Sequence, residues 1–263
     1  MLETMAELER NQLATGGAAA QLQRSYYERT STQFDEWHLQ EADEHHSALA
    51  WIDFLFADAD IGSILDVGAG TGRAIEFFGG RGRRIIGVEP SPAQIAQAVK
   101  KGIPPGQIVR ADGAALPFAD GSFDAVCEFG MLHHAERPEL VIAEMLRVAR
   151  KAVFISDSNR FGQGRLIARF GKFALYKLGL WNLLERARTG GRGYHFSERD
   201  GLFYSFSVYD HLRQISQASE HLWLLPVAQG SRGAWLRPLL THGHVLLCAF
   251  KKGFGPPLGS QIS

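Results

Sequence analysis

The chain has 263 residues, 45% of them hydrophobic, and its 28 basic side chains balance 28 acidic ones. This length allows one globular domain with an additional cap, and the zero formal net charge argues against a nucleic-acid-binding protein that relies on counterion release. Cys127 and Cys248 lie in apolar runs, so we expect core thiols and no metal site. No run is long enough for a transmembrane helix, and the first residues do not resemble a signal peptide. We therefore expect a cytoplasmic location.

The first part of the chain, residues 1–58, predicts a helical cap. Residues 1–24 are rich in Ala, Gln and Gly, which predicts a frayed start. Residues 41–56 have the apolar spacing of an amphipathic helix. Several aromatic residues lie between these segments, and we name Tyr27 and Trp37 as candidates for contact with a substrate.

Strand and helix patterns alternate over residues 59–156. Short apolar runs end in turn signals, and segments with helical spacing follow them. Alternation of this kind predicts a parallel sheet with helices on both faces. The predicted strands are 62–67, 84–89, 107–110, 123–128 and 151–156, and the predicted helices are 72–79, 92–101 and 137–149.

The pattern changes after the fifth predicted strand. Residues 157–208 predict a cap or lid insertion, in which 162–184 is helical and the Gly- and Arg-rich stretch 186–201 does not pack alone. Residues 209–263 predict closing strands after a short helix over 208–217. These strands, 221–229 and 243–251, form an antiparallel hairpin. We expect the whole chain, residues 1–263, to be a single domain.

Residues 64–73, Ile-Leu-Asp-Val-Gly-Ala-Gly-Thr-Gly-Arg, join the first strand to a turn with glycine at alternate positions. Glycine adopts positive φ and has no Cβ, so this turn can bend sharply and let a flat ligand lie on its backbone. Glu89 ends the second strand about twenty residues later, where α/β nucleotide folds hold a ribose diol. Arg73 occupies the position of the third glycine of the dinucleotide fingerprint, which disfavours an NAD(P)-dependent oxidoreductase.

The glycine turn and the acid after it resemble motifs of the class I S-adenosylmethionine (SAM)-dependent methyltransferases, and the likeness covers residues 61–156. It implies a Rossmann-like α/β fold with a mostly parallel seven-stranded sheet, helices on both faces and a helical cap insertion. It also implies SAM as the cofactor and S-adenosylhomocysteine as the product. By this resemblance the backbone from Gly68 to Gly72 faces the methionine part of SAM and Glu89 holds both ribose hydroxyls. Asp66 orders the turn or reaches the amino group; from its position alone it could simply cap its own turn.

Two later motifs extend the resemblance. Residues 110–118, Arg-Ala-Asp-Gly-Ala-Ala-Leu-Pro-Phe, are similar to the family's adenine segment, in which Asp112 accepts from the exocyclic amine and the next backbone amide meets a ring nitrogen. Residues 122–134 are similar to the fourth-strand segment of ubiquinone/menaquinone-type and other small-molecule methyltransferases. The cofactor-binding residues implied in this way are Asp66, Gly68, Ala69, Gly70, Gly72, Glu89, Pro90, Asp112, Gly113 and Glu128.

Three polar residues follow the fourth and fifth strands, at the carboxyl edge where ligands bind in open α/β sheets. They are His133, His134 and Asp157. Because the methyl group of SAM is already activated, the protein acts chiefly by aligning the nucleophile, the methyl carbon and the sulfur. An imidazole suits an acceptor that must lose a proton, such as a hydroxyl. We therefore name His134, His133 and Asp157 as candidate catalytic residues, with the alternative that the histidines only shape the pocket.

Two further polar residues could contact the acceptor. Asn159 follows the fifth strand and could bind the acceptor or cap the next helix. His195 lies among glycines and aromatic residues, which is typical of a mobile lid and equally of a surface loop.

The predicted cap is strongly basic. From Arg160 to Arg199 the acidic residues are Glu185 and Glu198, and the basic ones are at 160, 165, 169, 172, 177, 186, 188, 192 and 199. Arg165, a further candidate for substrate contact, shares one helical face with Arg169 and Lys172. This face could be a solvated surface, a surface that attracts an anionic acceptor, or one side of an amphipathic helix that contacts a membrane peripherally.

The sequence therefore predicts an enzyme of biosynthesis that transfers a methyl group from SAM to a small molecule. We expect an oxygen nucleophile on an anionic or a sugar- or lipid-linked metabolite. Two alternatives are C- or N-methylation of a quinone-like or other small molecule, and a non-catalytic SAM-binding regulatory partner, because cofactor motifs alone do not prove turnover.

Overall fold

The computed structural model describes residues 18–31, 44–58, 60–198, 200–227 and 238–255. Its main sheet consists of β1 (Ser63–Val67), β2 (Arg84–Val88), β3 (Ile108–Val109), β4 (Phe123–Phe129), β5 (Ala149–Ser158), β8 (His221–Pro226) and β9 (His244–Phe250). These seven strands lie in the order β3-β2-β1-β4-β5-β9-β8. The first five are parallel, whereas β9 is antiparallel to both β5 and β8. The predicted parallel sheet with a closing antiparallel hairpin is confirmed.

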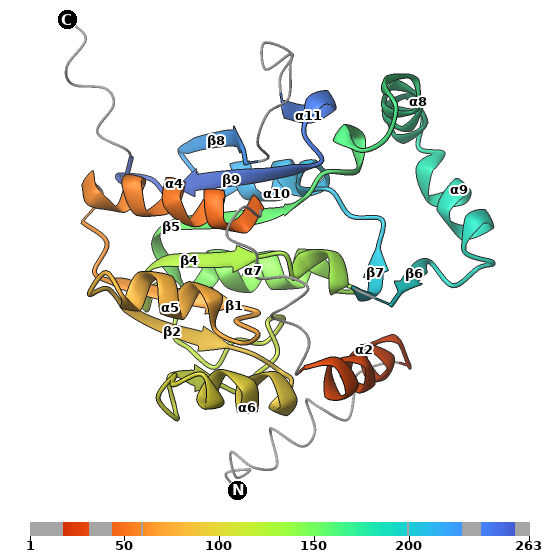
Figure 1. The fold of residues 1–263 in the computed structure, drawn as a ribbon. Helices are drawn as coiled ribbons and strands as arrows, with labels where there is room; N and C mark the ends of the chain where they lie inside the picture. The colour runs from red at the N-terminus through yellow and green to blue at the C-terminus, as the bar shows by residue number, and fades with distance from the viewer. Residues whose placement is uncertain (1–17, 32–43, 59, 199, 228–237, 256–263) are drawn as a thin grey trace, which may run out of the picture.

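Helices cover both faces of this sheet (Figure 1). The α-helices are α2 (Ala18–Thr30), α4 (Glu44–Asp58), α5 (Arg73–Gly79), α6 (Pro92–Lys100), α7 (Pro138–Val148), α8 (Leu166–Lys177), α9 (Trp181–Arg188), α10 (Leu212–Gln217) and α11 (Pro238–Thr241). Three short 3-10 helices are η1 (Leu132–His134), η2 (Arg160–Gly162) and η3 (Val208–His211). Ser91 caps α6 by accepting from the Gln94 amide, and Pro92 stands at its first turn, where a missing N–H costs nothing.

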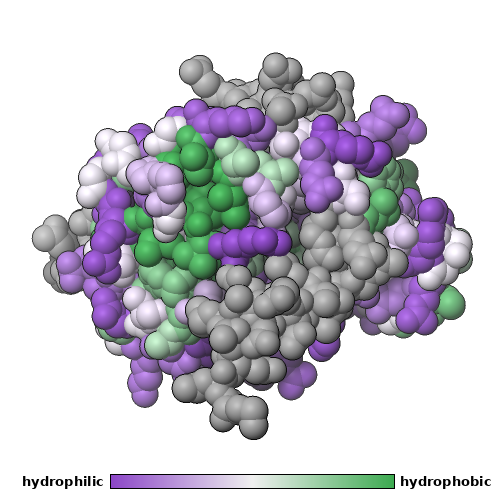
Figure 2. Space-filling view, turned by 90° about the horizontal axis from the view of Figure 1, so that it is seen from below, coloured by the Kyte–Doolittle hydropathy of each residue, from purple (hydrophilic) through white to green (hydrophobic). Residues whose placement is uncertain are grey.

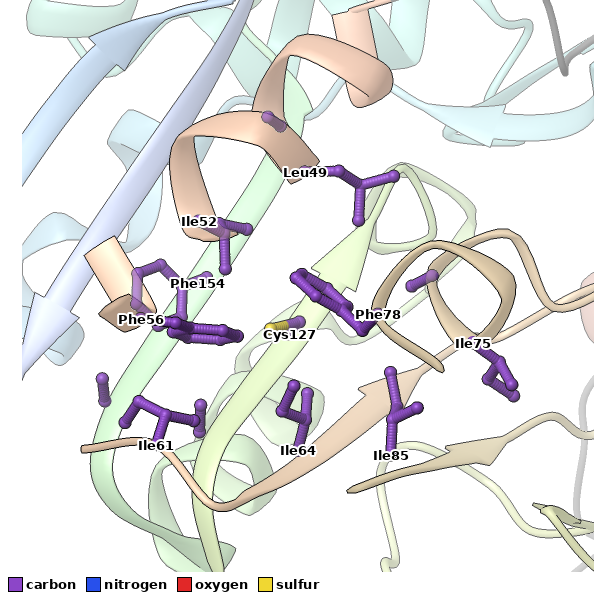
Figure 3. Packing of buried hydrophobic residues seen from close by; sticks show 14 of the residues in the cluster. Leu49, Ile52, Phe56, Ile61, Ile64, Ile75, Phe78, Ile85, Cys127 and Phe154 are labelled. Atoms are coloured by element: carbon purple, nitrogen blue, oxygen red, sulfur yellow. The ribbon is translucent and has the colours of Figure 1, made fainter. Parts of the chain in front are cut away.

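Two hydrophobic cores lie on opposite faces of the sheet because successive residues of a strand point to opposite sides. Ile64 belongs to the core under α4, α5 and α6, and its neighbour Leu65 belongs to the core under α7 and α10. Figure 3 shows the first core, where Phe56 lies between Phe78 and Phe154 with ring centroids 5.4 Å from each. These cores fix the carboxyl ends of β1, β2, β4 and β5 along one edge.

The cap differs from the sequence prediction in two places. Residues 18–24, expected to be frayed, form the start of α2, because Ala and Gln favour a helix. The single helix predicted over 162–184 is two helices, α8 and α9. Gly179, with a φ of 72°, ends the first of them in the left-handed conformation common after a helix.

The Gly- and Arg-rich stretch packs through partners from other parts of the chain. Residues Tyr194–Ser197 form β6, which pairs with β7 (Gly201–Tyr204) as an antiparallel hairpin. Gln23 of α2 accepts a hydrogen bond of 2.6 Å from the Leu202 amide, and the Tyr26 hydroxyl donates to the Glu198 carbonyl at 3.2 Å. Helix α2 and the β6–β7 hairpin therefore form one layer beside the carboxyl edge of the sheet (Figure 1).

Hydrophobic side chains are unevenly distributed over the surface. Seen from below, a hydrophobic area bordered by hydrophilic residues gathers on the left, and smaller hydrophobic areas lie near the right edge (Figure 2). Among the described residues the larger exposed apolar side chains include Trp51 and Phe54 of α4 and several on α8 and α9. No described helix combines the length and the apolar character needed to cross a membrane. Cys127 and Cys248 are buried and free, as predicted.

Candidate functional site

The turn after β1 is packed at both ends and open in the middle. Gly68, Gly70 and Gly72 have φ of 78°, 53° and 91°, the left-handed region that favours glycine. A Cβ on Gly68 would lie 2.5 Å from the Met131 side chain, and one on Gly72 would lie 1.8 Å from that of Ile103. A Cβ on Gly70 would meet nothing within 4 Å, so Gly70 leaves its backbone open to a ligand.

Glu89 faces this turn from the end of β2. Its Oε2 accepts from the Gly70 amide at 3.0 Å and its Oε1 accepts from the Ser91 amide at 2.8 Å. Each carboxylate oxygen has a second lone pair that can accept from a ligand hydroxyl. Burial raises the pKa of Glu89 to about 7, although the two backbone hydrogen bonds oppose this shift.

Asp66 lies one residue before the end of β1 and is also buried. Burial raises its pKa to about 7 against the opposing charge of Arg73, and Glu89 adds to the increase. Two carboxyl groups that are costly to ionise therefore lie beside the open turn. A bound cation or hydroxyl donor would favour their charged forms.

The remaining predicted cofactor residues line the same edge. Ala69 is buried and its amide donates to the Val88 carbonyl at 2.9 Å, which ties the turn to β2. Pro90 follows Glu89 and is half-buried. Asp112 is exposed and accepts from the Ala114 amide at 2.9 Å. Gly113 packs closely, because a Cβ there would lie 3.0 Å from Val67.

Tyr27 of α2 lies beside His134. Burial raises the pKa of its phenol, and the charges of Glu89 and Asp200 add to the increase. Its ring meets that of His134 edge-on at a centroid distance of 6.4 Å. Trp37, the other aromatic candidate, lies outside the described residues.

Glu128 supports the segment that carries the histidines. The side chain is fully buried at the end of β4, and its Oε1 accepts from the Met131 amide at 2.5 Å and from the Leu132 amide at 3.3 Å. Burial and the nearby charge of Asp157 raise its pKa well above the ordinary value, so its protonated form is favoured.

His133 and His134 form η1 directly after this support, with ring centroids 4.0 Å apart. His133 Nδ1 lies 2.7 Å from Asp157 Oδ1, and His134 Nδ1 lies 2.5 Å from the Leu202 carbonyl oxygen. Burial opposes ionisation of His133, but Asp157 raises the pKa of His133 well above its ordinary value. Burial and the neighbouring His133 lower the pKa of His134 to about 4. The structure thus brings all three candidate catalytic residues together.

Comparisons with known proteins agree with this geometry. Residues 65–155 match the family model described as a methyltransferase domain. An uncharacterised methyltransferase of Mycobacterium marinum is 37% identical over 131 residues, 49% of this chain and 49% of that protein. One of Mycolicibacterium gilvum is 42% identical over 89 residues, 34% of this chain and 35% of that protein. The stretch that the family model covers, residues 65–155, is a methyltransferase domain of the class I SAM-dependent type. The chain spans about half the length of the curated relatives it matches.

Solved structures share the fold of this methyltransferase. A SAM-dependent methyltransferase of Thermotoga maritima, described as a possible histamine N-methyltransferase, superposes with a TM-score of 0.56 at 19% identity and covers 87% of this chain and 99% of that one. The DhpI–SAM–HEP complex gives a TM-score of 0.59 at 17% identity, over 89% and 98% of the two chains. The family and the fold predicted from the glycine turn are confirmed, and with them SAM as the cofactor of the family.

The predicted acceptor residues of the methyltransferase are dispersed. The Asn159 side chain is buried, caps η2 by accepting from the Phe161 amide at 3.1 Å, and donates to the Leu239 and His242 carbonyls at 2.8 Å. His195 lies on β6 with its Nε2 2.9 Å from Glu185 Oε2. Arg165 is exposed just before α8.

Two residues that the sequence prediction omitted join the site. Gln23 reaches both Leu202 and the His134 ring, its Nε2 lying 3.5 Å from His134 Nδ1. Asp200 sits between β6 and β7, 3.7 Å from His133 Nε2 and 3.5 Å from His134 Nε2. A glycine after Asp200 signals a turn, but nothing in the sequence indicates that this turn reaches the histidines.

Proposed function

We propose that the chain transfers a methyl group from SAM to an oxygen atom of a small, anionic, lipid-linked molecule. The observation that carries the proposal is the placement of two sets of groups along one edge of the sheet. Glu89 and the open Gly70 backbone form the donor side, and His133, His134 and Asp157 form the acceptor side, with Tyr27 beside His134. This arrangement suits an in-line displacement, in which alignment provides most of the acceleration.

On the donor side, Glu89 accepts from the two ribose hydroxyls and the Gly70 backbone faces the methionine part. Asp66 interacts with the amino group, and Asp112 with Gly113 faces the adenine. We expect Glu89→Ala to weaken SAM binding by about 2–4 kcal/mol, roughly 30- to 1,000-fold, because two charge-assisted hydrogen bonds are lost. Isothermal titration calorimetry with SAM measures this change.

Glu76→Ala is the matched control, because Glu76 lies on the adjacent helix α5 and its side chain is half-exposed beside Lys101. It should bind SAM as the unmodified chain does. If the folded Glu89→Ala protein binds SAM equally well, the donor-site assignment is wrong. Release of S-adenosylhomocysteine during turnover separates an enzyme from a non-catalytic SAM-binding partner.

An oxygen acceptor is supported by the imidazoles, because a hydroxyl has to lose its proton whereas a neutral amine attacks directly. The chemical shift of a transferred ¹³C-methyl group distinguishes O-, N- and C-methyl products. Turnover of [methyl-¹³C]SAM with a bacterial lipid extract should give an O-methyl signal, and an N-methyl or C-methyl signal would contradict this part of the proposal.

The surface of α8 and α9 supports a lipid-linked acceptor. No residue of α8 is buried, and Ile167, Phe170, Ala174 and Leu178 recur with helical spacing on its outer side. Ile167 is 88% exposed and Leu178 is 70% exposed. A soluble domain seldom leaves such a contiguous apolar stripe uncovered unless it binds something.

The charges around this stripe favour an anionic bilayer surface. Between residues 163 and 192 the acidic residue Glu185 is buried, and the exposed charged side chains are all basic: Arg165, Lys177, Arg186, Arg188 and Arg192. An apolar stripe bordered by cations is typical of helices that lie in a membrane interface. The acceptor would then reach the catalytic edge from the lipid surface.

We expect the triple variant Ile167→Gln, Phe170→Gln, Leu178→Gln to bind vesicles of phosphatidylglycerol and phosphatidylcholine at least about tenfold more weakly, because apolar burial provides most of the affinity. Co-sedimentation measures the change. Trp51→Gln, Phe54→Gln on α4 removes exposed apolar surface elsewhere and should have no effect. Equal binding by both variants, or no binding by the unmodified chain, would contradict the membrane surface.

A cytoplasmic location completes the proposal. The free, buried thiols of Cys127 and Cys248 agree with a reducing compartment. The proposal also includes a small-molecule acceptor and no role in nucleic-acid binding, and the zero net charge of the chain supports the latter.

A further inference from the structure

Three side chains from two distant segments converge at the acceptor side of the site. They are His133 and His134 of η1 and Asp200 of the β6–β7 turn. One nitrogen of each ring and one carboxylate oxygen all lie within 4.8 Å of one another. The sequence offers no metal motif here, because the histidines and the aspartate are far apart along the chain.

Both imidazoles are held by the nitrogen that faces away from Asp200. His133 Nδ1 donates to Asp157 Oδ1 at 2.7 Å, and His134 Nδ1 donates to the Leu202 carbonyl at 2.5 Å. A carboxylate or carbonyl on one ring nitrogen is the usual outer partner of a metal-binding histidine, because it fixes the tautomer and orients the other nitrogen. Both Nε2 atoms are therefore directed toward the same carboxylate.

The spacing of these atoms suits a shared ion better than direct hydrogen bonds. The Asp200 oxygens lie 3.7 Å from His133 Nε2 and 3.5 Å from His134 Nε2. These separations exceed those of good hydrogen bonds. Two ligands bound to one ion at about 2.1 Å, with angles of roughly 90–110°, lie about 3.0–3.4 Å apart. The two Asp200 separations exceed this range by no more than a few tenths of an ångström.

We propose that His133 Nε2, His134 Nε2 and the Asp200 carboxylate bind one divalent transition-metal ion. Two imidazoles and one carboxylate form a ligand set suited to Zn²⁺, Co²⁺ or Fe²⁺ rather than to Mg²⁺ or Ca²⁺. The carboxylates of Asp200 and Asp157 balance the charge of such an ion. Asp200 is 39% exposed, so the remaining coordination positions are accessible to a ligand.

The chemical use of this ion rests on the proposed function. With both imidazoles bound to the ion, an acceptor hydroxyl that also binds it would release its proton to solvent rather than to a histidine, since a divalent ion lowers the pKa of a bound O–H group. The oxygen electron pair forms the new O–CH₃ bond. The S–CH₃ bond breaks and its electron pair stays on sulfur, giving S-adenosylhomocysteine.

Metal titrations of the full, tag-free chain test the proposal. After treatment with EDTA and removal of the chelator, Zn²⁺ is titrated by calorimetry and Co²⁺ by its visible absorption. We expect one equivalent of each ion, and Co²⁺ bands of a mixed nitrogen–oxygen site. Asp200→Asn and His134→Gln should each weaken Zn²⁺ binding by at least about tenfold, because each removes one of three ligands.

Asp120→Asn is the matched control, because Asp120 is also an accessible aspartate in an ion pair, with Arg147 at 2.8 Å, far from the histidines in the fold. It should bind Zn²⁺ like the unmodified chain. If the unmodified chain binds no Zn²⁺, or if Asp200→Asn binds it equally well, the metal site does not exist and Asp200 only pairs with the imidazoles. SAM titration of the same samples keeps the two proposals separate, since SAM binding without metal binding contradicts only this inference.

Discussion

The donor side and the cap of this methyltransferase are built in different ways. The donor side consists of a turn and an acid that are close in the sequence and rest on two hydrophobic cores, with Gly68, Gly72 and Glu89 held by close contacts. The cap has a helix without buried residues, α8, and is held by polar links to side chains and backbone that are distant in the sequence. Local sequence therefore determines the donor pocket, whereas long-range contacts determine the acceptor side.

The links that hold the cap are few and specific. Arg160, buried behind α8, pairs with Asp210 at 2.5 Å, and Trp181 Nε1 donates to the Ser205 hydroxyl at 3.2 Å. Arg169 Nη1 donates to the Leu240 carbonyl at 2.9 Å, and Lys172 Nζ donates to the Arg160 carbonyl at 2.6 Å. Two of the three cations that the sequence analysis placed on one helical face, Arg169 and Lys172, are thus engaged in holding the helix.

The largest expected effect is the loss of SAM affinity when the open backbone at Gly70 is covered. Gly70→Val puts a branched side chain on the open face and forces an unfavourable φ, so we expect SAM affinity to fall by at least about 100-fold with the far-UV circular dichroism spectrum largely kept. Calorimetry and circular dichroism measure the two quantities. Retained SAM binding would show that this face does not meet the cofactor.

Gly72→Ala is the complementary variant. Its Cβ would overlap Ile103, so we expect a lower melting temperature and only a secondary loss of SAM affinity. If Gly72→Ala is as stable as the unmodified chain, the turn is less tightly packed than the contacts indicate.

The second effect is a dependence of SAM binding on pH. The pKa values of Asp66 and Glu89 are both raised to about 7, by burial first, and the charge of Arg73 opposes the shift of Asp66. Because SAM favours the ionised carboxylates, its affinity should rise with pH up to about pH 7, by at most about tenfold per pH unit for each proton released. Calorimetry in buffers of different ionisation enthalpy counts these protons.

The ligand-free chain should show the opposite trend in stability. Folded Glu89 holds its proton up to about pH 7, whereas the ordinary pKa is 4.5, so between these values the folded state binds more protons than the unfolded state. The free energy of unfolding contributed by this group is therefore highest below about pH 4.5 and falls as the pH rises toward 7. Glu89→Gln should flatten the trend, and an unchanged profile would contradict the raised pKa.

The smallest effect concerns the cap. Arg169→Gln removes hydrogen bonds to the Leu240 and Gly164 carbonyls, so we expect a loss of about 1–2 kcal/mol and a fall of roughly 2–6 °C in melting temperature. Arg165→Gln, at an exposed position, should leave the melting temperature unchanged. Differential scanning fluorimetry measures both. If the melting temperature of Arg165→Gln falls by the same amount, the stabilising role is not specific to Arg169.

Sequence periodicity was sufficient for the sheet because each strand is a short apolar run between turn signals. It failed at the α8–α9 boundary, where Gly179 interrupts an apolar pattern that continues on both sides. It also failed for residues 18–24. Their composition favours the helix that they form, but the neighbouring glycines led us to predict a frayed start. Both errors concern local breaks rather than the arrangement of layers.

The site was predictable where its residues follow strands directly. Glu89 directly follows β2, Asp157 lies near the end of β5 and His133 lies in η1 shortly after β4, and topology alone brings such positions to one edge. Asp200 and Gln23 were not predictable, because they reach the histidines through the pairing of β6 with β7 and the packing of α2 on that hairpin. Asn159 looked equally suited to two roles, and its buried hydrogen bonds identify a structural cap.

The position of β9 has a consequence for synthesis on the ribosome. It comes last among the described strands in the sequence, yet it lies inside the sheet, between β5 and β8. Until His244–Phe250 emerges, the long strand β5 is an unpaired edge that carries Val153 and Ile155, both fully buried in the finished protein. An open apolar edge of this kind recruits other strands. Nascent chains that stall or terminate before residue 244 should therefore aggregate or require a chaperone, even though the complete donor turn has already been translated.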